Sequence, residues 1–73
     1  MTLIEAVNRA KSTEFSWLAI DEDLDIYLYD NKPRILPNKV EWYDETHCDL
    51  DRCTTPLAGT FKDWIIEIST LKV

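Results

Sequence analysis

The sequence contains only one glycine, Gly59, and one histidine, His47, among its 73 residues. Sites that hold a phosphate against the backbone favour glycine-rich loops, because a residue without a Cβ allows close approach. A single histidine also leaves few ways to place a general base beside a nucleophile. The composition therefore disfavours catalysis, and we expect a protein that binds rather than an enzyme.

Soft metal ligands are equally scarce. His47, Cys48 and Cys53 form one cluster, whereas a structural zinc site takes four ligands, usually including a close cysteine pair repeated elsewhere in the chain. The neighbouring acids, from Asp44 to Asp51, lack the central glycine and terminal glutamate of a calcium loop. We expect two reduced cysteines, no metal and no cofactor. A zinc site completed by a carboxylate or water, or a redox pair of cysteines, remains the alternative.

The sequence has neither a positively charged leader nor a long apolar run, since Met1-Thr2-Leu3-Ile4-Glu5 reaches a charge at once. Neither secretion nor membrane insertion is expected, which favours a cytoplasmic protein. A chain of 73 residues predicts one domain, residues 1–73, that buries only about 60% of its unfolded surface. Small domains of this kind are often stabilised by self-association, so a homo-oligomer is one expectation.

Negative charge is abundant: 14 acids against 8 bases give a net charge of −6. The acids gather at Asp21 to Asp25 and at Asp44 to Asp51. Such a field repels nucleic-acid phosphates and attracts basic protein surfaces, so direct nucleic-acid binding is disfavoured and a protein partner is favoured. Solubility alone is the competing explanation of the charge.

The opening residues predict a helix. Thr2 and Glu5 have the spacing of a capping box, and Leu3, Val7 and Ala10 form an apolar stripe of helical period. About ten residues are too few for an isolated helix to be stable, so this one must pack on a sheet.

Residues 14–30 predict an antiparallel hairpin. An apolar strand runs into a short acidic turn, Asp21-Glu22-Asp23, and then into strict alternation. Two rows follow from this alternation. The core row is Leu24, Ile26 and Leu28, and the water-facing row is Asp25, Tyr27 and Tyr29.

The rest of the chain predicts short strands around a long loop. Residues 34–36 are expected to form an edge strand, 40–43 a strand, and 44–56 the longest loop. A last strand at 64–68 turns Trp64, Ile66 and Ile68 to the core, and Leu71 and Val73 extend it. The fold class is α+β, with one N-terminal helix packed on an antiparallel sheet of three to five short strands.

The candidate partner-binding surface combines the acidic turn with the outward row of the second strand. Tyrosine is favoured at the centres of protein interfaces, and carboxylates steer basic partners. Packing of the tyrosines under a second small layer, covered by the acidic loop, is the alternative. Mimicry of nucleic acid by Asp21, Asp23 and Asp25 is another. The predicted site residues are Asp21, Glu22, Asp23, Asp25, Tyr27 and Tyr29.

Three short motifs carry a resemblance: Leu3-Ile4-Glu5-Ala6 in the helix, Trp17 after it, and Leu57-Ala58 followed by Asp63-Trp64 near the end. With them the chain resembles small proteins encoded by phages and prophages, and in particular the second class of Thoeris anti-defence proteins. That resemblance implies a small α+β oligomer that sequesters a signal molecule of the cyclic ADP-ribose type. The family places a glycine and basic residues where this chain has residues 12–16, Ser-Thr-Glu-Phe-Ser.

The sequence thus leads to a functional hypothesis. We expect a non-enzymatic phage or prophage accessory protein, with an anti-defence role, that binds a host protein through an acidic, aromatic surface. The alternatives are an oligomeric sponge for a nucleotide signal and a nucleic-acid mimic.

Overall fold

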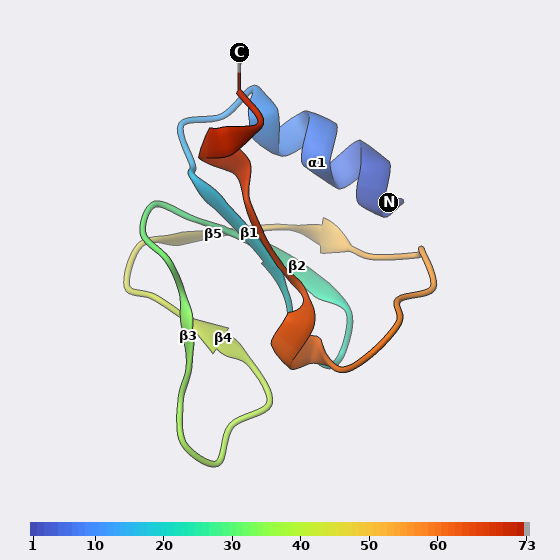
Figure 1. The fold of residues 1–73 in the computed structure, drawn as a ribbon, viewed down its shortest axis with the longest axis vertical. Helices are drawn as coiled ribbons and strands as arrows, with labels where there is room; N and C mark the ends of the chain where they lie inside the picture. The colour runs from blue at the N-terminus through green and yellow to red at the C-terminus, as the bar shows by residue number, and fades with distance from the viewer. Residues whose placement is uncertain (73) are drawn as a thin grey trace.

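The computed structural model describes residues 1–72 and has the predicted α+β fold (Figure 1). A four-stranded antiparallel sheet has the order β5-β2-β1-β6, and β3 and β4 form a separate two-stranded sheet. The elements are α1 (Leu3–Lys11), β1 (Trp17–Ile20), β2 (Asp25–Tyr29), β3 (Arg34–Ile35), β4 (Trp42–Tyr43), β5 (His47–Arg52), the 3-10 turn η1 (Phe61–Asp63), β6 (Ile65–Glu67) and the 3-10 turn η2 (Ile68–Thr70).

Helix α1 begins as the sequence predicts. The Thr2 hydroxyl accepts a hydrogen bond from the Glu5 backbone N–H at 3.2 Å, and the Glu5 carboxylate accepts one from the Thr2 N–H at 3.0 Å. These two bonds satisfy N–H groups that have no partner within the helix. Ala6 and Ala10 are fully buried where the helix packs on the core, since small side chains permit close approach.

The main core lies between α1 and the sheet. It is built from alternate residues of β1 and β2, which the register pairs as Leu18 with Leu28 and Ile20 with Ile26. Ile68 of η2 completes it. The predicted hairpin and its core row are therefore confirmed for Ile26 and Leu28. Leu24 packs against the same core but lies in the turn before β2, with a positive φ of 74°.

The prediction of a long loop at 44–56 is wrong, because His47–Arg52 forms β5, an edge strand paired with β2. Most of its side chains are exposed, and only Leu50 packs on the core. The strand is held by backbone pairing, with a register shift opposite Ile26 and Tyr27. A strand without a buried row has no hydrophobic alternation, so the sequence pattern could not reveal it.

The predicted last strand is shorter than expected. Strand β6 covers only Ile65–Glu67, and Ile68 already belongs to η2, where the Ser16 carbonyl accepts from the Ile68 N–H at 2.7 Å and the Ser69 N–H at 3.1 Å. Ile68 is buried in the core, and Trp64 and Ile66 are half-buried and pack against it, as predicted. The extension through Leu71 is wrong, since Leu71 is exposed after η2; Val73 lies outside the described residues.

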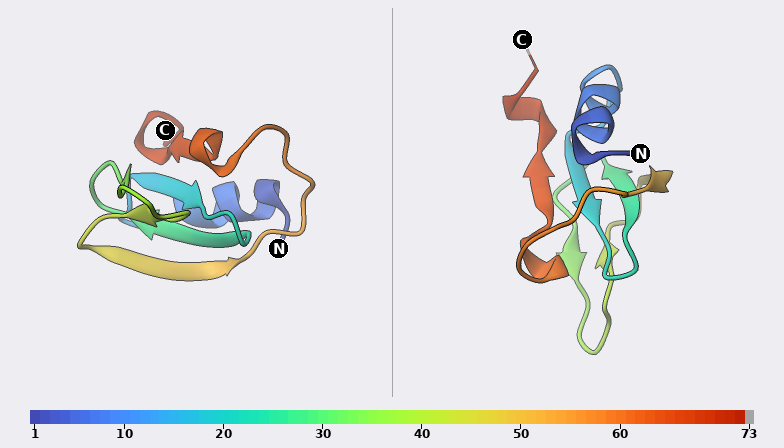
Figure 2. Two further views of the ribbon diagram at one scale, coloured as in Figure 1. Left: turned by 90° about the horizontal axis from the view of Figure 1, so that it is seen from below. Right: turned by 90° about the vertical axis from the view of Figure 1, so that its right-hand side faces the viewer.

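The β3–β4 hairpin projects from the rest of the chain (Figures 1 and 2). The strands predicted at 34–36 and 40–43 are each only two residues long. They pair Arg34 with Tyr43 and Ile35 with Trp42. Within residues 1–72, no helix is long and apolar enough to cross a lipid bilayer.

Candidate functional site

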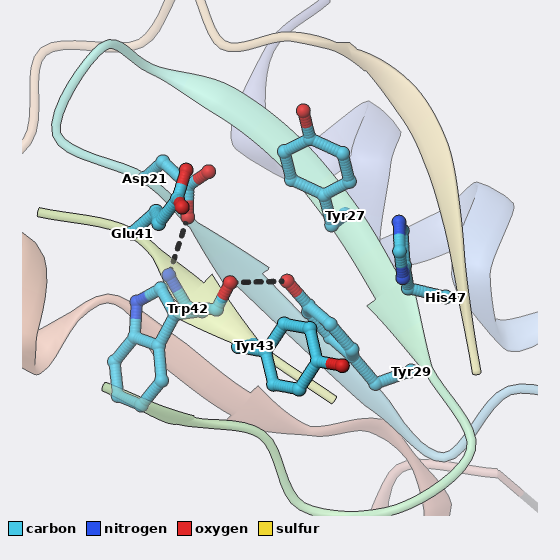
Figure 3. A pocket seen from close by; sticks show the side chains of 7 residues that line it. All are labelled: Asp21, Tyr27, Tyr29, Glu41, Trp42, Tyr43 and His47. Carbon is cyan, nitrogen blue, oxygen red and sulfur yellow. Dashed lines mark hydrogen bonds between the residues drawn. The ribbon is translucent and has the colours of Figure 1, made fainter. Parts of the chain in front are cut away.

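A pocket of about 180 Å³ lies between the main sheet and β4 (Figure 3). Its side chains come from the residue after β1, from β2, from β4 and the residue before it, and from the start of β5. Neither a lysine nor an arginine lines it. The lining residues are Asp21, Tyr27, Tyr29, Glu41, Trp42, Tyr43 and His47.

The strand register places the aromatic rings of the pocket together. Tyr27 and Tyr29 alternate with the core residues of β2 and so lie on the sheet face opposite α1. Pairing with β5 sets His47 opposite Tyr29. The ring centroids of Tyr27 and Tyr29 are 6.4 Å apart, and that of His47 lies 5.8 Å and 6.0 Å from them. The three rings therefore form one cluster.

Trp42 holds β4 over this cluster through three hydrogen bonds. Its backbone N–H donates to Asp21 Oδ1 at 2.8 Å, and its carbonyl accepts from the Tyr29 hydroxyl at 3.2 Å (Figure 3). The indole Nε1–H donates to the Phe61 carbonyl at 3.1 Å. A further backbone bond runs from the Glu22 N–H to the Val40 carbonyl at 3.3 Å. Directional polar contacts thus contribute to holding the β3–β4 hairpin on the sheet.

Asp21 is the buried acid of the site, only 6% exposed. Burial raises its pKa to about 6, against the opposing effect of the hydrogen bond from Trp42, and the charges of Asp23 and Glu41 raise it further. The expectation that Asp21 lies on an exposed acidic row is wrong. The residue follows β1 directly and its carboxylate accepts the Trp42 N–H, so it lies under the β3–β4 hairpin.

Several acids near Tyr27 and Tyr29 give this face of the sheet a negative potential. Burial raises the pKa of Tyr27, and the charges of Asp49, Asp25, Asp21 and Asp23 raise it further in that order. The nearby acids favour the neutral phenol because each would repel a phenolate.

Tyr29 lies in the same field but is covered. Burial raises its pKa, followed by the charge of Asp21, and it is only 2% exposed. The prediction that Tyr29 faces water is therefore wrong. The layer that covers it is the β3–β4 hairpin, through Trp42, and not the acidic loop, which was the predicted alternative. One oxygen of nearby Asp44, Oδ2, is buried without a hydrogen-bond partner among the described residues.

We call this region the acidic aromatic face. It consists of the seven pocket residues together with Asp23, Asp25 and Asp49.

The six predicted site residues do not all meet. Asp21, Tyr27 and Tyr29 line the pocket, whereas Asp23 is exposed in the turn and Asp25 is half-buried beside it. Glu22 is exposed and lines a different hollow. Asp21 and Asp23 lie between β1 and β2, and only Asp25 belongs to a strand, so the three acids do not form a strand-spaced row.

Sequence reasoning missed the pocket residues outside the first hairpin. The sequence pattern predicts a strand for Glu41, Trp42 and Tyr43 and a loop for His47, and it does not link either to Tyr27. Alternation within a strand gives the face on which a side chain lies, but not which distant segment covers that face. Only the pairing of β5 with β2 and the contacts of Trp42 bring them together.

The candidate metal cluster is divided between the two faces of β5. His47 is paired with Tyr29 and Cys48 with Leu28, so their side chains alternate across the sheet. Both cysteines are free thiols, Cys48 exposed and Cys53 buried. That both cysteines are reduced stays a prediction. Among residues 1–72, no three histidine, cysteine or acidic side chains are close enough to share a metal ion.

A second hollow, of about 830 Å³, lies between the tip of the β3–β4 hairpin and η1. It is wider than the first and contains two of the eight basic residues, Lys39 and Lys62, beside the aromatic rings of Phe61 and Trp64. The remaining lining residues are Glu22, Asn38, Val40, Gly59 and Thr60.

Comparison of the chain with protein-family models, with curated proteins and with solved structures finds no match.

Proposed function

We propose that this chain is a non-enzymatic accessory protein of a phage or prophage that binds a host protein through the acidic aromatic face and thereby blocks a defence system. The observation that carries the binding role is the concentration of carboxylates around Tyr27, at a pocket whose lining includes neither lysine nor arginine. The phage origin and the anti-defence role rest on the resemblance of the opening helix and the terminal segment to Thoeris anti-defence proteins.

The charge of this face favours a basic protein as the partner. Uncompensated carboxylates raise the rate of encounter with a positively charged surface and suppress binding to nucleic acid. Tyr27 and Tyr43 add partly exposed rings, the residue type that most often anchors protein interfaces. The acidic aromatic face therefore combines carboxylates that attract a basic partner with aromatic rings that can anchor it.

Affinity capture from host lysate, followed by mass spectrometry, tests the proposal. The test variant is the double substitution Asp25→Asn and Asp49→Asn, because neither carboxylate accepts a hydrogen bond within residues 1–72. The matched control is Glu14→Gln with Asp63→Asn, which changes the net charge equally at exposed positions outside the face. We expect the wild type and the control to retain one specific partner and the test variant to lose it.

The salt dependence of capture is the second part of this test. Capture through the acidic aromatic face should weaken steeply between 50 and 500 mM salt, because the Debye length falls about threefold over this range. A partner that the test variant retains as strongly as the control, at every salt concentration, would contradict the proposal.

The nucleotide sponge is the second candidate, and the 830 Å³ hollow favours it. That volume falls within the range of about 300 to 1,000 Å³ usual for small-molecule sites. Lys39 and Lys62 could pair with phosphates while Trp64 stacks on a base. Titration calorimetry with cyclic ADP-ribose tests it: the sponge predicts binding that Lys39→Gln with Lys62→Gln abolishes, and sedimentation shows whether the bound form is an oligomer. Absence of heat at millimolar ligand would refute it.

A further inference from the structure

The pocket on the acidic aromatic face combines rings and carboxylates in the way that suits a cation. In Figure 3 the side chains of Tyr27, Tyr29, Tyr43 and His47 and the carboxylates of Asp21 and Glu41 surround one space. We infer that this pocket receives a single lysine side chain of the partner protein, whose ammonium group enters among the tyrosines and reaches the Asp21 carboxylate. This inference rests on the proposed function and names the chemical group that the face recognises.

The size of the pocket selects a small group. The pocket has a volume of only about 180 Å³. It is well below the roughly 300 Å³ at which sites for drug-sized molecules begin. An ammonium group with its last few methylenes is of this size, whereas a nucleotide is not.

The chemistry of the walls selects a positive charge. An ammonium near the face of an aromatic ring is attracted by the electrons of that ring, and the attraction grows when water is excluded. Asp21 supplies a carboxylate that is almost fully buried yet lines the pocket. Burying a carboxylate without a counter-charge is unfavourable, so a cation in the pocket would relieve a cost already present in the free protein.

The hydrogen bonds of the pocket favour lysine over arginine. Asp21 Oδ1 already accepts the Trp42 N–H at 2.8 Å, which leaves Oδ2 as the free oxygen of the buried acid. Arginine binds carboxylates best through two parallel bonds to both oxygens, whereas lysine acts as a point charge and needs one. The Tyr29 hydroxyl donates to the Trp42 carbonyl, so its oxygen can accept a second bond from an ammonium.

Titration of the whole chain with lysine derivatives, followed by two-dimensional amide NMR, tests the inference directly. The probe is Nα-acetyl-lysine methylamide, and its comparison probes are the matching arginine derivative and the lysine derivative acetylated at Nε. We expect saturable shifts of the Trp42, Tyr29 and His47 amides at millimolar lysine probe, at least threefold weaker binding of arginine, and no saturation by the neutral derivative.

Pocket variants and a matched control complete the test. Glu41→Gln and Tyr43→Leu alter exposed pocket residues, so the fold should persist, and the NMR spectrum itself shows whether it does. Each should weaken binding of the lysine probe about two- to fivefold, the range of one ion pair or one cation–ring contact. Glu45→Gln, an exposed acid outside the pocket lining, should leave it unchanged.

The outcomes separate this inference from the proposed function. Equal binding of the three probes, preference for arginine, or equal affinity in the pocket variants and the control would overturn the lysine site. These results concern the lysine probe and do not depend on whether the Asp25→Asn, Asp49→Asn variant loses its partner in the capture experiment. The proposed function can therefore stand even if the lysine site is refuted. If lysine binds as expected and capture does not depend on the face, the proposed function fails instead.

Discussion

The two faces of the main sheet are closed in different ways. On one face, α1 covers Leu18, Ile20, Ile26 and Leu28, and the contacts are aliphatic. On the other, the β3–β4 hairpin covers Tyr29, held in part by hydrogen bonds of Trp42. The first face has a smaller, mostly apolar pocket of about 120 Å³, lined in part by Leu18 and Ile20. The second encloses a pocket of about 180 Å³ that contains a buried carboxylate.

This difference separates what stabilises the molecule from what it offers to a ligand. Burial of aliphatic side chains does not depend on direction and tolerates no water, so the helix face provides most of the stability. A hydrogen bond contributes a net stabilisation of only about 1 kcal/mol. The hairpin face can therefore open at lower cost than the sheet unfolds, and its pocket is larger than that of the helix face.

The largest expected effect comes from the helix face. Ile26→Ala removes a fully buried side chain and should lower the free energy of unfolding by about 2 to 5 kcal/mol. A domain of this size has about 4 to 11 kcal/mol in total. Ile35→Ala is the matched control, since it makes the same change in the half-buried β3 of the hairpin and should cost about 1 kcal/mol. Urea unfolding measures both, and equal losses would erase the distinction between the faces.

The sequence predicts the helix face well for a physical reason. The capping box of Thr2 and Glu5 and the alternation of Ile26 and Leu28 are local patterns, and the structure contains both. Each depends on residues no more than four positions apart, which a single sequence displays directly. The α+β class follows from these elements.

The hairpin face could not be predicted in the same way. Strand β5 contributes His47 through backbone pairing without a hydrophobic row. Asp21 is buried where it accepts a hydrogen bond from Trp42, 21 positions away. Alternation identifies Tyr27 and Tyr29 as opposite to the core, and that part of the prediction is correct. What covers Tyr29 depends on a contact between distant segments, which local periodicity does not encode.

The next effect tests the buried acid of the hairpin face. Between about pH 4 and pH 6 the folded protein keeps a proton on Asp21 that the unfolded chain has already released, so stability decreases as the pH rises through this interval. Asp21→Asn keeps an oxygen for the Trp42 N–H but does not titrate. We expect it to be more stable than the wild type by about 1 to 2 kcal/mol at pH 7.5, after allowance for screening by water in the pocket, and equally stable at pH 3.5.

Thermal or urea unfolding of both proteins across this pH range measures that difference. Asp30→Asn is the control, since it makes the same change at an exposed acid that is not among the charges raising the pKa of Asp21. A wild type that gains stability relative to Asp21→Asn as the pH rises would show that the charged carboxylate is stabilised in the fold, contrary to its raised pKa.

The smallest effect distinguishes opening of the hairpin from unfolding of the sheet. Tyr29→Phe removes the hydroxyl that donates to the Trp42 carbonyl at 3.2 Å, and should cost about 1 kcal/mol. The loss should appear locally: hydrogen exchange of the Trp42 amide, which is bonded to Asp21, should accelerate about fivefold, while the Leu28 amide changes less. Tyr27→Phe is the control, because Tyr27 makes no bond to Trp42. Equal acceleration at Trp42 and Leu28 would mean that the two faces open together, and that the hairpin is not a separate layer.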